Sequence, residues 1–498
     1  MLATSLIGVW AASRPAVLSR QWVPTTPAFT EHYFLAVSNG AGGAVEAFVR
    51  NPEQNAGAAI GTRTVITTGI RVILRATRRP DIDGVQNSDG TLTLRKVVDG
   101  EADLRLHRAT EGDLMWFYPL PSASWTYREP SDAGDGWRVG TLNDAGMREA
   151  PIASLISGIA QLRAPSLRSP YIQSITIERH GTLVLDQYFY GFSSEQQHDV
   201  RSAGKSVTTL MVGRAIQDTN AFSPSSGVMS LLHNYAPVRN DNRQKQQMTV
   251  ANLMTMASGL ACDDNDDSSP GHEDTMQSQP AGTDWYRYTL DLPMIATPGT
   301  RSLYCTAGIN LLGAIVESAT GVPLDRYFQN RFAAPMQFRS YAMWLMPKPA
   351  DAAYMGGGDY FRPRDFLKFG QLLLARGRWY DRPVIDPSWI AQSIVPRTAP
   401  EGEGDRYGYG WHLTRLSVDG REYDVVSAGG NGGQLMIVIP KLDLAIMITA
   451  GNYNQFPVWS HILPDVAAAA VRSCELATAQ SPSALREAAP ALPRKRLP

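Results

Sequence analysis

The sequence predicts two domains of different fold class: an all-β domain, followed by a larger domain that mixes helices and strands. Residues 8–120 alternate apolar and polar side chains in short runs separated by turn-forming residues. Residues 141–475 combine apolar runs at helical spacing with strand-like alternation. The chain has 498 residues, of which 43% are hydrophobic. This length and composition are sufficient for more than one core.

The first region, residues 1–120, reads as an antiparallel β domain. Apolar residues share one face of three predicted strands: Ile70, Val72 and Leu74; Leu92 and Leu94; Leu104 and Leu106. Turns such as Asn39-Gly40 and Asn87–Gly90 separate the strands. We therefore expect a barrel or sandwich of about eight strands. Two roles stay open: a lipocalin-like barrel that holds a small apolar ligand, or a packed domain that only covers or positions its neighbour.

The remaining chain divides into a linker, a mixed domain and a tail. Residues 121–140 are rich in Pro, Ser, Gly and Asp, which is typical of a linker. In residues 141–475 we expect a hairpin around Arg179-His180-Gly181 and two closing strands at 435–439 and 444–449. Helices are expected around 203–217, 249–257, 307–320 and 363–376. The Ala/Pro-rich residues 476–498 predict a disordered tail.

Composition excludes several classes of protein. The formal charge of −1 gives no electrostatic footprint for nucleic acid or an anionic membrane surface. No stretch of 18 apolar residues predicts a transmembrane helix. The first charged residue is Arg14, so the apolar start lacks the basic region of a clear signal peptide. Cytoplasmic and periplasmic locations therefore both stay open.

The cysteines and histidines show no spacing typical of a metal site. The three cysteines are too few for a disulfide framework. Cys262 and Cys305 are either joined by one bridge in an oxidising compartment or reduced as small buried hydrophobes. Both states stay open, and we expect no metal.

The first motif with catalytic chemistry is Ser202-Ala203-Gly204-Lys205, at the start of a predicted helix. Residues three apart on a helix share one face, so the two side chains can meet. A neutral lysine is a base that can make serine a nucleophile, and the positive helix end favours both the oxyanion and a lowered lysine pKa. The alternative is a capping serine beside a solvated lysine.

Only seven of the 46 basic residues are lysines, an arginine excess that favours a GC-rich bacterial source.

The second motif places Tyr304 between a Pro298-Gly299 turn and an apolar helix. A phenol in that position can relay protons between a nucleophile and a leaving group, although a tyrosine that only packs is the alternative. The third motif, Ser427–Gln434, has four glycines in five positions directly before a predicted strand. Such a backbone can bring an N–H close to a substrate carbonyl and form half of an oxyanion hole. The alternative is a tight β turn.

Taken in order, the three motifs resemble those of serine hydrolases of the penicillin-binding-protein and class C β-lactamase superfamily, nearest its esterase and aminohexanoate-dimer (nylon-oligomer) hydrolase branch. The resemblance covers residues 136–470 and includes the segments 249–260, 311–321 and 407–411. It implies a β-lactamase-like α/β (α+β) fold, with an antiparallel sheet flanked by helices and a helical subdomain. The site would lie between the sheet and that subdomain.

The resemblance also implies roles for individual residues. Ser202 would be the acylated nucleophile, Lys205 its base, and Tyr304 the second member of the base system and proton donor to the leaving group. The second oxyanion amide would come from Asn431, with Gly430 and Gly432 beside it and a slip of one residue left open. The mechanism needs no cofactor and no metal.

Two departures bear on the substrate. The residue two positions after Tyr304 is Thr306, where the superfamily often has Asn or Ser. The Lys-Thr-Gly triplet of true β-lactamases, whose cation grips a β-lactam carboxylate, is absent before the last strands. The resemblance therefore implies hydrolysis of a small-molecule ester or amide rather than efficient β-lactam hydrolysis.

An acidic segment, Cys262–Asp274, separates the first two motifs and allows three interpretations. It can attract a substrate amine through its charge, or it can be a solvated loop. It can also resemble a calcium loop, since Asp263, Asn265, Asp267 and Asp274 match four ligand positions of an EF-hand. Ser268 replaces the glycine that such a loop requires, which counts against calcium.

Two functions from different classes follow. The first is a serine hydrolase whose acyl pocket is lined by aromatic residues, for which we consider Trp285, Tyr286, Tyr288 and Trp411, each of which can equally pack in a core. The second is a non-catalytic receptor or scaffold of the penicillin-binding type, with a ligand-binding β domain. The complete Ser202, Lys205 and Tyr304 set favours the hydrolase.

Overall fold

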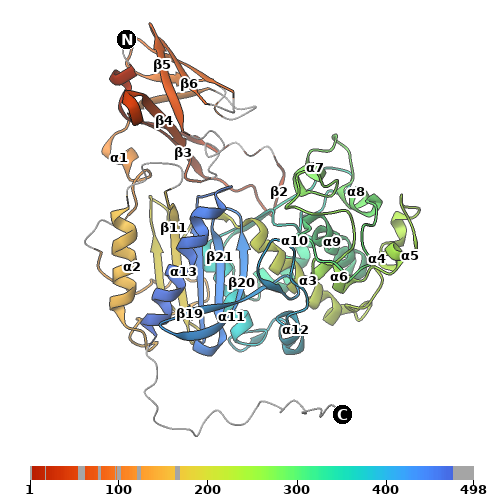
Figure 1. The fold of residues 1–498 in the computed structure, drawn as a ribbon. Coiled ribbons are helices and arrows are strands. Elements are labelled where there is room, and N and C mark those ends of the chain that lie inside the picture. The colour runs from red at the N-terminus through yellow and green to blue at the C-terminus, as the bar shows by residue number, and fades with distance from the viewer. Residues whose placement is uncertain are drawn as a thin grey trace.

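The computed structural model describes residues 3–16, 18, 20–53, 62–76, 80–95, 97, 103–120, 125–162 and 169–474, with the backbone alone for 456–463. An all-β body and a larger α/β body are stacked in Figure 1, the first at the top. The predicted C-terminal tail lies outside the described residues. The two predicted fold classes are therefore confirmed.

The N-terminal body is a closed antiparallel barrel, which decides between the barrel and the sandwich. Its eight strands are β1 (Gly8–Pro15), β3 (Thr30–Asn39), β4 (Val45–Arg50), β5 (Arg63–Thr68), β6 (Arg71–Arg75), β7 (Ile82–Gln86), β8 (Leu92–Leu94) and β9 (Leu104–Arg108). A short helix, α1 (Glu111–Leu114), follows them.

Side chains fill the barrel as a core. Val72, Leu74, Leu92 and Leu94 are buried in one cluster with Trp10, as period-two alternation predicts. The prediction was wrong for Ile70, which is 63% exposed because it lies in the tight turn between β5 and β6. In its described part the interior of the barrel is thus filled by apolar side chains.

The larger body contains an eight-stranded sheet in the order β10-β12-β11-β22-β21-β20-β19-β18, antiparallel throughout except for the β10–β12 pair. These strands are β10 (Arg138–Val139), β11 (Ile172–Arg179), β12 (Thr182–Tyr188), β18 (Arg406–Tyr407), β19 (His412–Val418), β20 (Arg421–Gly430), β21 (Gln434–Ile439) and β22 (Leu444–Ala450). The predicted hairpin and the two predicted closing strands are present.

The sheet separates two cores. On β22, Ile446 and Ile448 belong to the core beneath α2 (Glu149–Gln161) and α13 (Phe456–Ser473). Their neighbours Ala445 and Met447 point the other way, into the core that includes α11 (Pro363–Leu374). Figure 1 shows α2 and α13 on the same side of the sheet. Strand β22 is therefore buried on both faces at the centre of the body.

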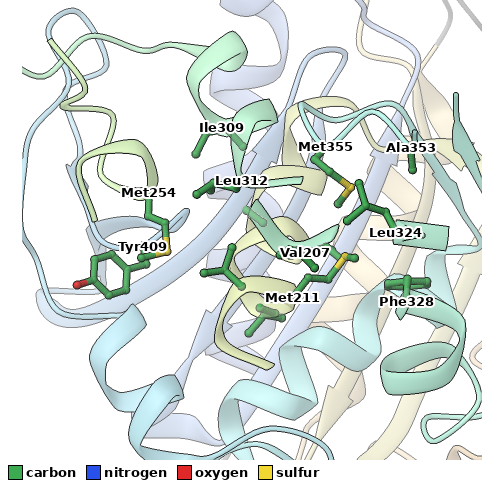
Figure 2. Packing of buried hydrophobic residues seen from close by; sticks show 14 of the residues in the cluster. Val207, Met211, Met254, Ile309, Leu312, Leu324, Phe328, Ala353, Met355 and Tyr409 are labelled. Carbon is green, nitrogen blue, oxygen red and sulfur yellow. The ribbon is translucent and has the colours of Figure 1, made fainter. Parts of the chain in front are cut away.

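The second core extends into a helical region built around α3 (Gly204–Thr219) and α9 (Thr306–Thr320). Figure 2 shows Val207 and Met211 of α3 packed near Ile309 and Leu312 of α9. Helix α3 is buried on nearly all sides, which explains its weak amphipathic pattern. Its first turn, with Ser202 just before it, is therefore held in place by tertiary packing.

Shorter helices surround this pair: α4 (Val228–Leu231), α5 (Arg243–Gln246), α6 (Val250–Met254), α7 (Glu273–Gln277), α8 (Trp285–Asp291), α10 (Leu324–Phe328) and α12 (Pro387–Ser393). The helix expected over 249–257 ends at Met254, because Met256 takes a left-handed φ of 58° that cannot continue a helix. In the described ranges no single helix is long and apolar enough to span a membrane, and the one pair that passes by length and composition, α9 with Leu324–Ala333, is bent by 78°.

A small second sheet joins the two bodies. Its order is β13 (His198–Asp199), β15 (Asp359–Phe361), β14 (Tyr341–Trp344) and β2 (Trp22–Val23). Strand β2 belongs to the region predicted as the β domain, yet it extends a sheet of the larger body. The described part of the predicted linker is also integrated, since β10 lies at the sheet edge and Asp135 pairs with Arg364 at 2.7 Å.

Candidate active site

The turn that carries Ser202 connects β13 to α3 and is tightly constrained. Arg201, directly before the serine, has a left-handed φ of 50°, a costly conformation for a residue with a side chain. Asp199 holds it there, because its carboxylate accepts a hydrogen bond from the Arg201 N–H at 3.0 Å and contacts the guanidinium at 2.8 Å. This strained turn presents Ser202 at the entrance of α3, half-buried.

Lys205 lies beside this serine, as the i,i+3 spacing predicts. Its Nζ donates a hydrogen bond to the Ser202 Oγ at 2.8 Å, and the side chain is only 1% exposed. Burial lowers the pKa of Lys205, because removing water disfavours the charged ammonium, while nearby carboxylates oppose that shift. The lysine therefore has the environment of a base rather than that of a solvated surface cation.

Tyr304 meets the same two residues from the α9 side. Its ring centroid lies 5.1 Å from the Lys205 Nζ. Burial raises the pKa of the Tyr304 phenol well above its ordinary value, and a hydrogen bond with Ser202 opposes that rise. The phenol is thus protonated at neutral pH and available as a proton donor beside the serine.

The acidic segment fixes the position of Tyr304. The Asp264 N–H donates a hydrogen bond to the Tyr304 carbonyl at 2.8 Å, and the Asp264 carboxylate accepts one from the Thr306 N–H at 2.7 Å. Cys262 and Cys305 form a disulfide across the same contact, which decides the question left open by the sequence. Asp264 is therefore a structural anchor at the start of α9 that the charge pattern alone did not reveal.

The glycine-rich loop between β20 and β21 completes the arrangement. A Cβ on Gly430 would clash with the Val200 carbonyl and lie 3.2 Å from the Ala203 N, so the bare backbone of Gly430 touches the turn that carries Ser202. The Asn431 side chain turns away, exchanging hydrogen bonds at 2.7 Å with Asn454. Gly432, with a φ of 97°, leaves room for the Tyr453 ring.

The structure adds residues that sequence reasoning missed. His412, on β19, has its ring 6.4 Å from that of Tyr304, and burial together with the charge of Lys205 lowers the pKa of His412 to about 4. Glu273, at the start of α7, accepts a hydrogen bond from the Tyr354 hydroxyl at 2.7 Å. These residues come from distant parts of the chain and carry no local motif, so only the fold reveals them.

A buried acid, Asp359, lies beneath the turn that carries Ser202. The Asp359 carbonyl accepts a hydrogen bond from the Val200 N–H at 3.0 Å, and its carboxyl group is fully buried against Gly204. Neither carboxyl oxygen has a hydrogen-bond partner among the described residues. Burial, with a smaller contribution from Asp199, raises the pKa of Asp359 to about 8. The group is therefore largely neutral at pH 7.

The candidate acyl-pocket aromatics mostly pack in the core. Trp285, Tyr286 and Trp411 are almost fully buried, whereas Tyr288 donates a hydrogen bond to the Pro270 carbonyl at 2.5 Å. Asp264 lies in the segment that was considered as a calcium loop but is not one of its four candidate ligands. Its carboxylate accepts hydrogen bonds from the backbone N–H groups of Glu273 and Thr306. No group of three or more His, Cys, Asp or Glu in the described chain is arranged to hold a metal ion.

Comparison with known proteins identifies the family and the fold of the larger body. The model of the Beta-lactamase family matches residues 173–458, more than half of the chain. Similar solved structures include EstCE1, a hydrolase with promiscuous acyltransferase activity (16% identity, 64% of this chain and 99% of that one, TM-score 0.51), and a LovD6 mutant of simvastatin synthase from Aspergillus terreus (16%, 65% and 97%, TM-score 0.50). A structure described as a 6-aminohexanoate-dimer hydrolase from Bacillus anthracis shares 19% identity over 60% of this chain and 79% of that one, with a TM-score of 0.49. No curated protein matches the chain.

Proposed function

The chain belongs to the Beta-lactamase family, and we propose that it is a serine hydrolase that cleaves an ester or amide of a small molecule through an acyl-enzyme on Ser202. The observation that carries the proposal is the hydrogen bond between the buried Lys205 Nζ and the Ser202 Oγ at 2.8 Å. A buried lysine with a lowered pKa, in contact with a serine hydroxyl, is the arrangement that nucleophilic catalysis needs.

Acylation follows from the positions of three side chains. The neutral amine of Lys205 accepts the hydroxyl proton as the Ser202 Oγ attacks the substrate carbonyl carbon. The tetrahedral intermediate then collapses and expels the alcohol or amine. Tyr304, whose phenol is protonated and hydrogen-bonded to Ser202, donates a proton to that leaving group and recovers one from Lys205. Water attacks the acyl-enzyme by the reverse sequence and frees the serine.

Two backbone amides would hold the oxyanion. One is the N–H of Ser202 itself, within the constrained turn that follows Arg201. The second comes from the glycine-rich loop. The expected donor was Asn431, but the contact of Gly430 with Val200 and Ala203 favours Gly430, the one-residue slip that the sequence left open. Fixed amides of this kind stabilise the developing charge without reorganising.

The ester-or-amide choice is tested with paired chromogenic substrates, p-nitrophenyl butyrate and the corresponding p-nitroanilide.

Ser202→Ala should lower kcat/KM by at least about 1,000-fold, because losing a nucleophile usually costs more than that. The matched control is Ser225→Ala, an exposed serine in the same helical region. A thermal unfolding midpoint equal to that of the wild type shows that the loss is chemical. Residual turnover above a thousandth of the wild-type rate would contradict the assignment.

A further inference from the structure

The N-terminal domain sends one segment across to the catalytic domain. This insert segment, Arg20–Phe29, lies between β1 and β3 of the barrel, and the Ala16 N–H closes its base by donating to the Phe29 carbonyl at 2.9 Å. Its strand β2 pairs with β14, with Trp22 opposite Trp344, and the Leu345 N–H donates to the Gln21 carbonyl at 2.8 Å. Figure 1 shows β2 beside the helical region of the catalytic domain.

The insert segment lies close to the nucleophile turn. In the small sheet, β2 is followed by β14, β15 and β13, and β13 leads directly into that turn. The Trp22 ring packs edge-on against Tyr360 of β15, with centroids 5.0 Å apart, and Tyr360 pairs with Asp199. One packed residue, Tyr360, therefore lies between Trp22 of the insert segment and Asp199, the residue that holds Arg201.

Arg20, at the start of the insert segment, is an exposed cation that contacts Trp344 of β14 and Gln277 of α7. Its guanidinium stacks on the Trp344 ring, 3.4 Å from the centroid, which fixes its orientation. One Nη donates to the Gln277 Oε1 of α7 at 3.4 Å, a long hydrogen bond. Burial lowers the pKa of Arg20, and the negative charge of Asp199, three residues before Ser202, opposes that shift.

The carboxylates of Asp199 and Glu273 already accept hydrogen bonds from groups other than Arg20. Both oxygens of Asp199 are taken by Arg201. The Glu273 Oε1 accepts hydrogen bonds from the Tyr354 hydroxyl at 2.7 Å and from the Gln277 Nε2 at 3.0 Å. Within the described ranges no carboxylate forms an ion pair with Arg20, so its planar fork of donors stays available to an incoming anion.

Resting on the proposed hydrolase function, we infer that Arg20 binds a carboxylate on the acyl part of the substrate and thereby sets specificity for half-esters or half-amides of dicarboxylic acids. The barrel domain then has a defined role: it completes the substrate site through the insert segment. The barrel is also docked at a second point, where the Tyr171 hydroxyl donates to the Trp116 carbonyl at 2.7 Å. Two attachments therefore hold Arg20 in position against the larger body.

The test compares each mono-p-nitrophenyl ester of adipic and suberic acid with its methyl ester, which has the same chain length and no charge. For Arg20→Gln, the ratio of kcat/KM between the acid and its methyl ester should fall about 10- to 100-fold for at least one chain length, the size of a lost charge-assisted hydrogen bond. Arg20→Lys, which keeps the charge but not the fork, should give an intermediate ratio. The control is Arg71→Gln, another exposed arginine of the barrel, in an ion pair with Asp83.

The possible results separate the two proposals. A wild-type enzyme that cleaves these esters with a ratio unchanged by Arg20→Gln at both lengths would overturn the inference and leave the hydrolase function intact. An equal fall in the Arg71→Gln control would also overturn it, since the effect would then come from net charge. If the folded wild-type protein cleaves neither ester in a Ser202-dependent reaction, the proposed function fails and the inference fails with it.

Discussion

The Nζ of Lys205 lies 2.8 Å from the Oγ of Ser202, and opposing influences act on this one amine. Burial lowers the pKa of Lys205, whereas the negative charges of Glu273, Asp264 and Glu403 raise it. Two of these acids come from the segment Cys262–Asp274, for which a solvated loop was one of three interpretations of the sequence. That segment therefore tunes the base of the proposed reaction.

Glu273→Gln should move the acid limb of the kcat/KM profile to lower pH. Neutral Lys205 is the active form, so kcat/KM rises with pH through the pKa of Lys205. Removing the Glu273 charge lowers that pKa, and the rise then occurs at lower pH. The glutamine oxygen can still accept from Tyr354. Profiles from pH 5 to 10, with Asp274→Asn as the control, check this; an unmoved limb or a shift to higher pH would count against the assigned base.

Gly430→Ala should lower kcat by at least about 100-fold, the usual cost of a lost oxyanion donor. A methyl group there meets the Val200 carbonyl and lies close to the Ala203 N, so the loop and the nucleophile turn must move apart. Gly429→Ala is the matched control, since its Cβ would have only an ordinary contact, 3.7 Å from Leu435. Equal activity of the two folded variants would show that the loop position is unimportant for turnover.

Loss of the disulfide should destabilise the protein and disturb Tyr304 together. The bridge closes a loop of 43 residues, for which chain entropy gives about 3–4 kcal/mol. Urea unfolding of Cys262→Ser measures the loss of free energy of unfolding. The kcat of the same variant should also fall, because the bridged Cys305 is the chain neighbour of Tyr304. Cys474→Ala removes the free thiol instead. The unfolded wild type should expose one reactive thiol without reductant, and a count of three would show that the bridge is absent.

Relative to the wild type, Asp359→Asn should be more stable at pH 8 than it is at pH 5. The folded wild type holds this proton up to a pKa of about 8, whereas an unfolded carboxyl releases it near 3.8. Between these values the folded state binds more protons, so stability falls as pH rises. The variant escapes that loss. Thermal midpoints of variant and wild type at both pH values check this, with exposed Asp381→Asn as the control; a difference that does not grow with pH would contradict it.

Local patterns predict most of the fold and the contact between Ser202 and Lys205. Ser202 and Lys205 are three residues apart at a helix start, and helix geometry alone brings them together. The strands around Leu435 and Leu444 follow from apolar runs bounded by turn residues. Such features depend on neighbours within a few residues, so a single sequence contains them.

Long-range contacts account for what the sequence did not predict. Asp264 binds the backbone of Tyr304 and Thr306, some 40 residues along the chain, and no charge pattern distinguishes it from Asp263 or Asp266. The pairing of Trp22 with Trp344 is more distant still, and it attaches a segment of the β domain to a sheet of the larger body. The preference for Gly430 over Asn431 depends on which residue touches the nucleophile turn.

The most direct test of the account is labelling of the purified protein with a fluorophosphonate, with the modified peptide identified by mass spectrometry. We predict one label per chain on Ser202, lost in Ser202→Ala and strongly slowed in Lys205→Ala, because the hydroxyl then lacks the base that lies 2.8 Å away. Absence of label on the folded wild-type protein, or stoichiometric label on another residue, would contradict it.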